Sequence, residues 1–367
     1  MNPRVVVYAS EGRVLHAFAL DLETGALSLS SSATLPEIVQ YAAVDARRRI
    51  LYISASDRDT RHLVVALAID PRTGELRPHG DPVVPADGRV IHLCADGEGR
   101  HLVLAHPTTH RLSVLALQGD GSLGAPVAQA EDMDTGFFAH HAKLDPEGGG
   151  LVACALGADA TSTAAEKPGV LTAFRYERGV LARTGRVALG PGLGPRHLEY
   201  AHGRIYVAVE RGNRLAVFDY AGGVLAPAPR FVVGTLAAPA SVRPSQRAGA
   251  IRLHPNGCWL YVTNRANAAD ASGAFAGGEN NLALFHVDPQ TGRPETRGHF
   301  ETGGVEPRTF TIDPTGRFLI VANHTTLGAL PRRWTVFRID DAGRLERVHD
   351  YDRATADLFW IGSVALS

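Results

Sequence analysis

The sequence predicts an all-β fold: a seven-bladed β-propeller in which each blade is a sheet of four antiparallel strands. One phrase occurs seven times, an apolar strand that ends in a turn with glycine and is followed by a residue such as leucine. A second phrase, made of a strand, a turn and another strand, recurs six times. The period of roughly 45 to 65 residues lies in or slightly above the range of four-stranded propeller blades.

The seven copies of the first phrase predict seven hairpins. They begin at Phe18, Leu67, Leu115, Phe174, Phe218, Phe285 and Phe337. Turns of the form Asp-Pro-x-Thr-Gly, and shortened versions of them, reverse the chain because aspartate or proline initiates the turn and glycine supplies a positive φ. Each hairpin joins two neighbouring strands of a blade.

The clearest single copy contains three predicted strands, over Arg196–Tyr200, Arg204–Val209 and Leu215–Tyr220, separated by turn signals. Consecutive strands in such a sheet reverse direction, so the start of the first strand and the end of the second lie at the same edge. Arg196 and Glu210 therefore face the same opening.

The two ends of the chain predict how the ring closes. The N-terminal run Arg4–Ser10 resembles the second strand of a blade, and the C-terminal run Leu358–Leu366 resembles a first strand without a successor. Pairing them completes the seventh blade and removes the exposed edges that an open sheet would leave. We therefore expect one domain over residues 1–367, because closed repeat architectures hold a single domain at this length.

Composition excludes several classes of partner. The formal net charge is −1, and acidic and basic residues are interleaved, which leaves no electrostatic footprint for nucleic acid or an anionic membrane. No apolar segment fits a signal peptide or a membrane span, so we expect a cytoplasmic protein. We also expect a monomer or a small homo-oligomer. Cys94, Cys154 and Cys258 are widely spaced in apolar runs, which predicts buried thiols and no disulfide scaffold.

Two loops exceed the repeat, residues 157–169 and residues 266–280, and both are rich in glycine and alanine. Both fall between the predicted second and third strands of their blades, so they should lie on the edge that carries Arg196 and Glu210. Loops of this length are either functional coverings or tolerated insertions, and the sequence leaves both interpretations open.

The repeat also predicts which residues line one mouth of the central channel. The starts of the first strands supply Gln40, His92, His140, His141, Arg196, His197, Arg308 and Thr309, and the ends of the second strands supply His106, Glu210, Arg265 and His324. Converging cationic and imidazole groups cost energy unless a ligand anion compensates them. The set predicts an anion-binding site, although each member alone also fits a structural role.

His140 and His141 form an adjacent pair within this set. Neighbouring side chains of a strand point to opposite faces of the sheet. We therefore expect only one of the two imidazoles to enter the channel, while the other packs against the blade or faces solvent.

Metal chemistry is the alternative for a histidine-rich channel. A calcium site needs several Asp, Asn and Glu oxygens that converge, whereas Glu210 stands among arginines, which would repel a divalent cation. The sequence has no HExxH or CxxC motif, and the glycine-rich run 190–194 precedes a strand in place of the helix that a dinucleotide site requires. We expect no metal and no cofactor.

Together these motifs resemble the family of seven-bladed propeller lactonases, which includes bacterial 6-phosphogluconolactonase and the fungal carboxymuconate lactonizing enzyme. The resemblance covers essentially the whole chain. Its strongest parts are GPRH at Gly194–His197, YVAVE ending at Glu210, LYVTNR ending at Arg265, HHAKLDPEG starting at His140 and PRTFTIDPTGRFLIVAN starting at Pro307. It implies a metal-free site of His140, Arg196, Glu210 and Arg265, which either hydrolyses a sugar lactone or interconverts a muconate and its lactone.

The favoured function is hydrolysis of a small anionic or polyhydroxy lactone, with 6-phosphogluconolactone as the first candidate. Hydrolysis needs an activated water, stabilisation of the tetrahedral oxyanion and a proton for the leaving alkoxide. We assign Glu210 as general base and His140 as acid. Arg196 and Arg265 are the anion clamp and oxyanion stabiliser. The expected further substrate contacts are His141, His197, Arg308 and His324.

Three alternatives remain open. The arginines should hold the pKa of Glu210 low, in which case Glu210 is a counter-ion and His140 is the base. A carboxy-cis,cis-muconate cyclase would use the same arginines to hold carboxylates. A non-catalytic binding platform is the alternative from another class, since fold does not fix function, and it would show apolar or aromatic residues at its mouth.

Overall fold

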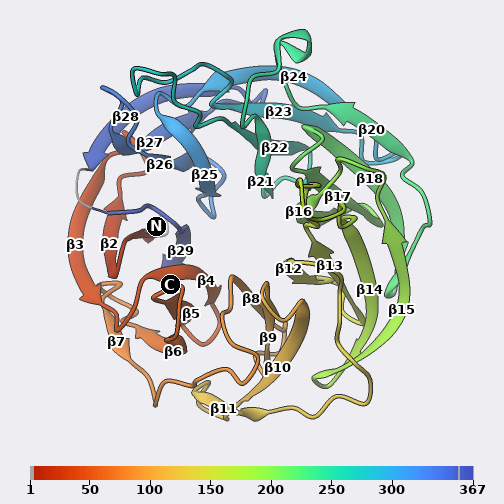
Figure 1. Ribbon diagram of the computed structural model, residues 1–367. Coiled ribbons are helices and arrows are strands. Elements are labelled where there is room, and N and C mark those ends of the chain that lie inside the picture. The colour runs from red at the N-terminus through yellow and green to blue at the C-terminus, as the bar shows by residue number, and fades with distance from the viewer. Residues whose placement is uncertain (1–3, 354–355, 367) are drawn as a thin grey trace.

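The computed structural model describes residues 4–353 and 356–366. Over these residues the chain forms seven antiparallel sheets, which are arranged as the blades of a ring around a central channel (Figure 1). The predicted seven-bladed β-propeller is confirmed. We call the blade that contains both chain ends the closing blade and number the others 1 to 6 along the chain.

The first half of the ring holds four blades, each with its strands given from the channel outwards. The closing blade consists of β29 (Ile361–Leu366), β1 (Arg4–Glu11), β2 (Val14–Leu20) and β3 (Leu27–Thr34). Blade 1 consists of β4 (Val39–Asp45), β5 (Ile50–Ser56), β6 (His62–Ile69) and β7 (Leu76–Pro78), and blade 2 of β8 (His92–Ala95), β9 (His101–His106), β10 (Arg111–Leu117) and β11 (Leu123–Pro126). Blade 3 consists of β12 (Ala139–Leu144), β13 (Gly150–Ala155), β14 (Val170–Glu177) and β15 (Val180–Ala188).

The second half holds the remaining three blades. Blade 4 has a fifth strand and consists of β16 (Pro195–Ala201), β17 (Arg204–Val209), β18 (Arg214–Ala221), β19 (Val224–Leu225) and β20 (Phe231–Gly234). Blade 5 consists of β21 (Arg247–Leu253), β22 (Trp259–Arg265), β23 (Asn281–Val287) and β24 (Pro294–Glu301), and blade 6 of β25 (Val305–Ile312), β26 (Phe318–Thr325), β27 (Arg332–Ile339) and β28 (Leu345–Arg353). A single 3-10 turn, η1 (Pro239–Ser241), is the one helical element of the described residues.

The ring closes within one sheet, as predicted. β29 pairs with β1 in antiparallel register from Arg4 opposite Leu366 to Ala9 opposite Ile361. The Ser10 hydroxyl extends the contact, because it accepts a hydrogen bond from the Trp360 amide at 2.9 Å. The C-terminal run therefore supplies the innermost strand of a blade whose other strands come from the N-terminus.

The apolar core of the described residues lies between the blades. Seven clusters of buried side chains each join two neighbouring blades. In one of them, Val6 and Tyr8 of the closing blade pack with Leu51 and Ile53 of blade 1. A second strand such as β5 is covered on both faces and is buried throughout, which explains why such strands are nearly continuous apolar runs.

The hairpins have the predicted turn chemistry and also join the blades. Asp70 accepts hydrogen bonds from the amides of Arg72 and Thr73, and Gly74 then adopts φ 78°. The carbonyl of Gly74 accepts a hydrogen bond from Tyr8 of the preceding blade at 2.8 Å. The same contact recurs in three further pairs: Tyr52 with Gly121, Tyr206 with Gly292 and Tyr261 with Gly343.

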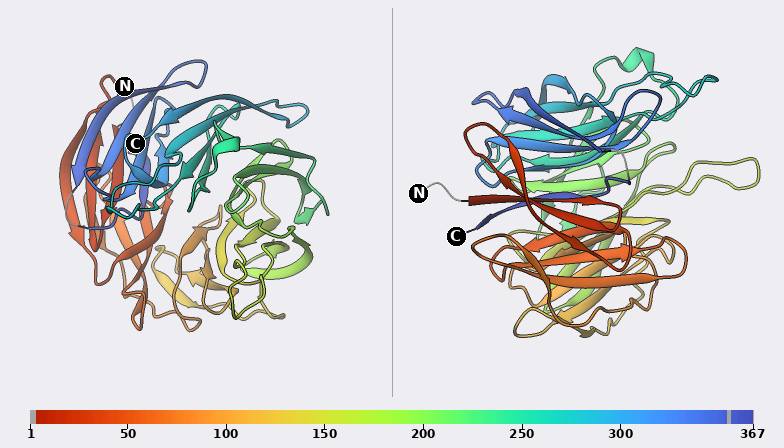
Figure 2. Two further views of the ribbon diagram at one scale, coloured as in Figure 1. Left: turned by 45° about the horizontal axis from the view of Figure 1, so that its top comes forward. Right: turned by 90° about the vertical axis from the view of Figure 1, so that its left-hand side faces the viewer.

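The two inserts lie where the sequence predicts. Residues 157–169 connect β13 to β14, residues 266–280 connect β22 to β23, and both extend from the face opposite the chain termini (Figure 2). Asp159 of the first insert pairs with Arg211, the neighbour of Glu210, at 2.7 Å. Both loops therefore border the mouth that carries Arg196 and Glu210.

The three cysteines are unpaired, as predicted. Cys154 is buried, but the prediction of a buried thiol is wrong for Cys94 and Cys258, which are only half-buried. Cys258 lies in the β21–β22 connection, and Cys94 lies in the short innermost strand β8, where it packs against the apolar cluster between blades 2 and 3.

Candidate functional site

The innermost strands begin with an irregularity that shapes the channel mouth. The register shifts at the second residue of β4, β12 and β16 and at the fourth residue of β25, so that one extra residue stands between two paired ones. These extra residues are Gln40, His140, Arg196 and Arg308. A bulge of this kind breaks the alternation of a strand and redirects a side chain, and bulges are common next to active sites.

The bulge in β12 corrects one sequence prediction. We expected only one of His140 and His141 to enter the channel, but both imidazoles contact the ring of His197, with centroids 5.1 Å and 4.8 Å apart. Ala139 pairs with Ala155 and His141 with Cys154, which leaves His140 as the extra residue. His140 lines the pocket at the mouth, while His141 lies against His92, at 4.0 Å between ring centroids.

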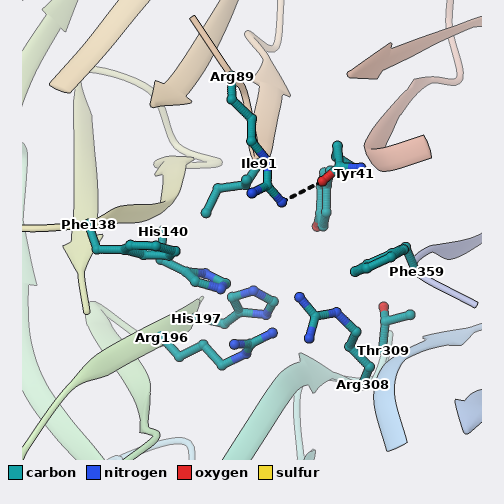
Figure 3. Close-up of a pocket in the computed structure, with 11 residues that line it drawn as sticks. Tyr41, Arg89, Ile91, Phe138, His140, Arg196, His197, Arg308, Thr309 and Phe359 are labelled. Atoms are coloured by element: carbon teal, nitrogen blue, oxygen red, sulfur yellow. Dashed lines mark hydrogen bonds between the residues drawn. The ribbon is translucent and has the colours of Figure 1, made fainter. Parts of the chain in front are cut away.

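A pocket lies at this mouth, and its walls carry cations without a carboxylate among the described residues that line it. Arg196 and Arg308 contribute guanidinium groups from blades 4 and 6, and Arg89 extends from the opposite wall (Figure 3). The remaining lining residues are Gln40, Tyr41, Ile91, Phe138, His140, His197, Thr309 and Phe359. An anion in this pocket would meet only positive and neutral groups.

Glu210 lies beside this pocket and links two of the predicted arginines. Its Oε2 atom accepts hydrogen bonds from Nη1 of Arg196 at 2.6 Å and from Nη2 of Arg265 at 2.8 Å. All three side chains are buried. Burial opposes ionisation of Glu210, but the two arginines outweigh it and hold the pKa of the carboxyl far below its usual range. Glu210 is therefore an ionised counter-ion in the unliganded protein.

Glu306 is a second carboxylate of this network, and the sequence analysis missed it. Its Oε1 accepts a hydrogen bond from Nη1 of Arg265 at 2.8 Å and lies 3.7 Å from Nη1 of Arg308. The backbone of Glu306 adopts φ 57°, a conformation that non-glycine residues adopt uncommonly. Burial opposes its ionisation, but Arg265 and Thr325 lower its pKa to about 2. The sequence carried a signal for this position, because the pair Pro307–Arg308 repeats the pair Pro195–Arg196. Glu306 directly precedes its pair, where blade 4 has Gly194.

The pocket arginines are destabilised as cations. Burial, together with Arg265 as a neighbouring charge, lowers the pKa of Arg196 to about 10. Burial, together with Arg196 and Arg265, lowers the pKa of Arg308 to about 9. Both groups remain charged at neutral pH, and their crowding is the cost that a bound anion would relieve.

The imidazoles of the pocket are neutral. Burial is the main cause that lowers the pKa of His140 well below its usual value, and Arg196 adds to it. The pKa of His197 is lowered in the same way, by burial and then by His141 and Arg196. Nδ1 of each of these rings is buried and has no hydrogen-bond partner. A neutral imidazole with a free nitrogen can accept a proton from a ligand or a water molecule.

Four of the other predicted residues surround the pocket without lining it. His92 and His141 lie against each other and against His197. His324 contacts Phe359 in a tilted arrangement, with ring centroids 4.6 Å apart, and Arg265 lines an adjacent pocket with Glu210 and Glu306. His106 does not line the pocket, and its imidazole bonds the Ser113 hydroxyl at 2.8 Å and the Gly88 carbonyl at 3.3 Å. The predicted Arg308 and His197 do line the pocket.

Arg89, Phe138 and Phe359 are pocket residues that the sequence analysis missed. Phe359 supports the site, because the guanidinium groups of Arg58 and Arg308 lie 4.5 Å and 4.7 Å from its ring centroid. Arg89 and Phe138 belong to connections before β8 and β12, which vary between blades and do not follow the repeat.

No cluster of three or more potential ligands that could hold a metal ion occurs among the described residues. The expectation that the site works without a metal or a cofactor remains a prediction. No helix of residues 4–353 or 356–366 is long and apolar enough to cross a membrane.

Fold and site together define a seven-bladed β-propeller with a cationic pocket at one mouth of its channel. Residues 5–357 match the model of the family described as "Lactonase, 7-bladed beta-propeller". The chain belongs to this lactonase family, so the resemblance found in the sequence is confirmed.

Relatives agree with this assignment, and solved structures share the fold. The chain is 29% identical over 327 residues to a 6-phosphogluconolactonase of Bacillus subtilis, which covers 86% of this chain and 85% of the relative. It is 27% identical over 377 residues to a 6-phosphogluconolactonase of Pectobacterium carotovorum, with both chains fully covered. The structure of a periplasmic gluconolactonase of Pseudomonas aeruginosa has the same fold, with a TM-score of 0.77 at 23% identity over 100% of this chain and 99% of that one.

Proposed function

We propose that the protein hydrolyses a small anionic sugar lactone, with 6-phosphogluconolactone as the first candidate substrate. The single observation that carries the proposal is the pocket of three arginines and two neutral imidazoles, whose described lining residues include no carboxylate. Two relatives at 29% and 27% identity carry the name 6-phosphogluconolactonase, which favours this substrate. The partner is then a small molecule.

The pocket contains the groups that lactone hydrolysis needs. Arg196 and Arg308 supply donors for the oxyanion that forms when water adds to the lactone carbonyl carbon. His140 accepts the proton of the attacking water. As the tetrahedral intermediate collapses, the ring C–O bond breaks and the protonated imidazole returns its proton to the leaving alkoxide. One water is consumed, and His140 ends in its starting state.

The surroundings of Glu210 favour its role as a counter-ion and His140 as the base. A carboxylate whose Oε2 accepts two arginine hydrogen bonds is a weak base, because taking a proton would leave both cations unpaired. Glu210 and Arg265 then hold Arg196 in position for the substrate. Arg265 has a supporting place in this proposal, since its two terminal nitrogens already bond Glu210 and Glu306.

The proposal includes catalysis without a metal ion, because the guanidinium groups stabilise the charge that a metal would otherwise stabilise. It also includes a cytoplasmic location, since three unpaired cysteines, two of them half-buried, suit a reducing compartment. His324 and His141 shape the site from behind Phe359 and His197.

A substrate panel tests the proposed function. The purified protein is assayed by pH-stat against 6-phosphogluconolactone, gluconolactone and a muconolactone, and by ultraviolet absorbance against 3-carboxy-cis,cis-muconate. We expect acid release from the sugar lactones and no absorbance change with the muconate. Turnover of the muconate alone would assign the cyclase reaction, and saturable binding without any turnover would assign a binding platform.

A further inference from the structure

Arg89 is a guanidinium group at the pocket whose charge the protein does not neutralise. Among the described residues its one hydrogen bond is from Nη2 to the neutral Oε1 of Gln40, at 2.6 Å. Gln40 is fixed in turn, because its amide nitrogen bonds the carbonyls of Ile38 and Ser56 at 3.2 Å and 3.4 Å. Arg89 is half-buried, and burial followed by the nearby Arg58 lowers its pKa. The side chain is thus held in place at an electrostatic cost.

An arginine with a structural role in this protein differs from Arg89 in its hydrogen-bond partners. Arg211 is buried beside the same mouth, and it bonds Asp159 and Glu166 together with the backbone carbonyls of Leu156 and Leu193. Its charge is compensated by two carboxylates, and both of its terminal nitrogens donate hydrogen bonds. Arg89 lacks a carboxylate partner, so an anion that enters the pocket is the group that would compensate it.

The charges around the pocket do not balance. Arg89, Arg196, Arg265 and Arg308 are four cations, while Glu210 and Glu306 are two carboxylates, so four minus two leaves an excess of two positive charges. Arg247 and Arg58 are left out because they pair with Asp159 at 3.5 Å and with Asp357 at 2.9 Å. Each of these aspartates also pairs with a second arginine, so the excess is at least two. A monoanion would neutralise half of this excess, whereas a phosphoryl group carries about −1.5 to −2 at pH 7.

The charges also lie on different walls. Arg196 and Arg308 come from one side of the pocket together with His197, and Arg89 comes from the opposite side with Ile91 (Figure 3). A substrate that places its reacting carbonyl between His140, Arg196 and Arg308 therefore presents its far end to Arg89. Gln40 lies beside Arg89 and keeps the guanidinium group directed into the pocket.

We propose that Arg89, held by Gln40, is the residue that selects a lactone with a phosphoryl group remote from the reacting carbonyl. This inference rests on the proposed function for the position of the carbonyl. It adds that phosphorylated lactones are preferred over unphosphorylated ones, and that the preference resides in one side chain from the β7–β8 connection.

Two substitutions test this role, and both keep the size of the side chain. Arg89→Met removes the charge, and Gln40→Glu keeps Arg89 but places a carboxylate where the neutral oxygen lies 2.6 Å away. The readout is the ratio of kcat/KM for 6-phosphogluconolactone to that for gluconolactone. We expect Arg89→Met to lower the ratio by about 10- to 100-fold, the usual range for a hydrogen bond to a charged group, mainly through KM. Gln40→Glu should lower it in the same direction.

The matched control is Arg214→Met, which removes the same charge from an exposed position at the start of β18 on the same face. It should leave the ratio within about twofold, because exposed charges act weakly at a distance in salt. An equal fall of both kcat/KM values in Arg89→Met would assign Arg89 a structural role and overturn the inference. A ratio that stays the same because neither kcat/KM value changes would overturn the inference too.

A binding measurement separates this inference from the proposed function. Inorganic phosphate and acetate are titrated calorimetrically against wild type and Arg89→Met. We expect phosphate to bind wild type more tightly than acetate does, and Arg89→Met to lose that preference. If wild type hydrolyses no lactone, the proposed function fails, but the loss of phosphate binding in Arg89→Met would still support an anion subsite at Arg89. Equal phosphate binding by both proteins would overturn it.

Discussion

Glu210 and His140 are chemically different kinds of group in this site, although both are buried and titratable. Glu210 is fixed by two arginines, and its charge is part of a network that continues through Arg265 to Glu306. His140 is neutral and has an unpartnered Nδ1 in the pocket wall. The residue that can accept a proton without leaving two arginines unpaired is therefore the histidine.

Paired substitutions measure this difference. His140→Gln should lower kcat by about 10²- to 10⁴-fold, the usual cost of removing an acid–base catalyst, with little change in KM. Glu210→Gln keeps the shape of the side chain but loosens Arg196, so KM should rise and kcat should fall by less than in His140→Gln. The opposite order of the two kcat values would show that Glu210 is the base.

The pH dependence of kcat/KM gives an independent check on His140. His140 must be neutral to act as the base. Its pKa is lowered by burial and then by Arg196, and to a smaller extent by Arg308 and His92. Glu210 has a smaller opposing effect and raises the pKa. The acidic limb should therefore lie below pH 6.5, the ordinary value for histidine. Constant activity from pH 8 to pH 6.5 and below would agree. A limb centred at or above pH 6.5 would contradict the assignment.

At the scale of elements, the sequence predicts the repeat but not its local breaks. The β-runs and the hairpins follow from patterns that recur around the ring. The predicted pairing of Arg4–Ser10 with Leu358–Leu366 follows from two incomplete copies of the repeat, and the paired strands are Arg4–Glu11 and Ile361–Leu366. The positions of Arg196, Glu210 and Arg308 followed from the same repeat. The orientation of His140 and His141 did not, because strand alternation assumes a register that the bulge in β12 interrupts.

Non-repeating connections account for most of the remaining difference. Arg89 precedes β8, Phe138 precedes β12 and Phe359 precedes β29, and no blade offers a second copy that would reveal their places. Their contacts depend on side chains from blades far apart in the sequence. Glu306 is the exception among the residues that were missed, because its position follows the repeat. It precedes Pro307 and Arg308 as Gly194 precedes Pro195 and Arg196.

The tyrosine contacts between blades predict a measurable contribution to stability. Tyr261 is fully buried and donates to the carbonyl of Gly343 at 2.7 Å. Tyr261→Phe leaves this carbonyl without a partner, which should lower the free energy of unfolding by about 1–3 kcal/mol. Urea denaturation measures the change.

Tyr351→Phe is the control for this measurement. The hydroxyl of Tyr351 bonds the Leu27 amide from a half-buried position, where water can replace it. Its cost should be smaller than that of Tyr261→Phe. Equal stability of Tyr261→Phe and wild type would mean that the hydroxyl contributes nothing to the interface between blades.

At the scale of the whole molecule, buried neutral histidines make the fold sensitive to acid. A set of them has a lowered pKa chiefly because of burial: His92, His106, His140, His141, His197 and His324. The pKa of His324 is lowered from 6.5 to about 4. Between these values the unfolded chain binds a proton that the folded chain does not, so acid favours unfolding.

Stability should therefore be constant above about pH 7 and should fall as pH decreases through 6.5, with a slope of about 1.4 kcal/mol per pH unit for each such histidine. Glu306, whose pKa is lowered from 4.5 to about 2, adds a further loss below pH 4.5. Urea midpoints at pH 8, 7, 6 and 5 measure the effect, and His324→Gln should reduce the dependence below pH 6.5. A midpoint that stays constant from pH 8 to pH 5 would contradict the neutral state of these histidines.

In the proposed reaction, an arginine pocket of this propeller hydrolyses an anionic lactone without a metal ion. The most direct measurement is kcat/KM of the purified protein with 6-phosphogluconolactone after exhaustive treatment with EDTA. We predict undiminished hydrolysis, with kcat/KM of about 10⁴ M⁻¹s⁻¹ or more, the lower bound for typical enzymes. Absence of hydrolysis, or activity that EDTA removes and a divalent cation restores, would contradict the account.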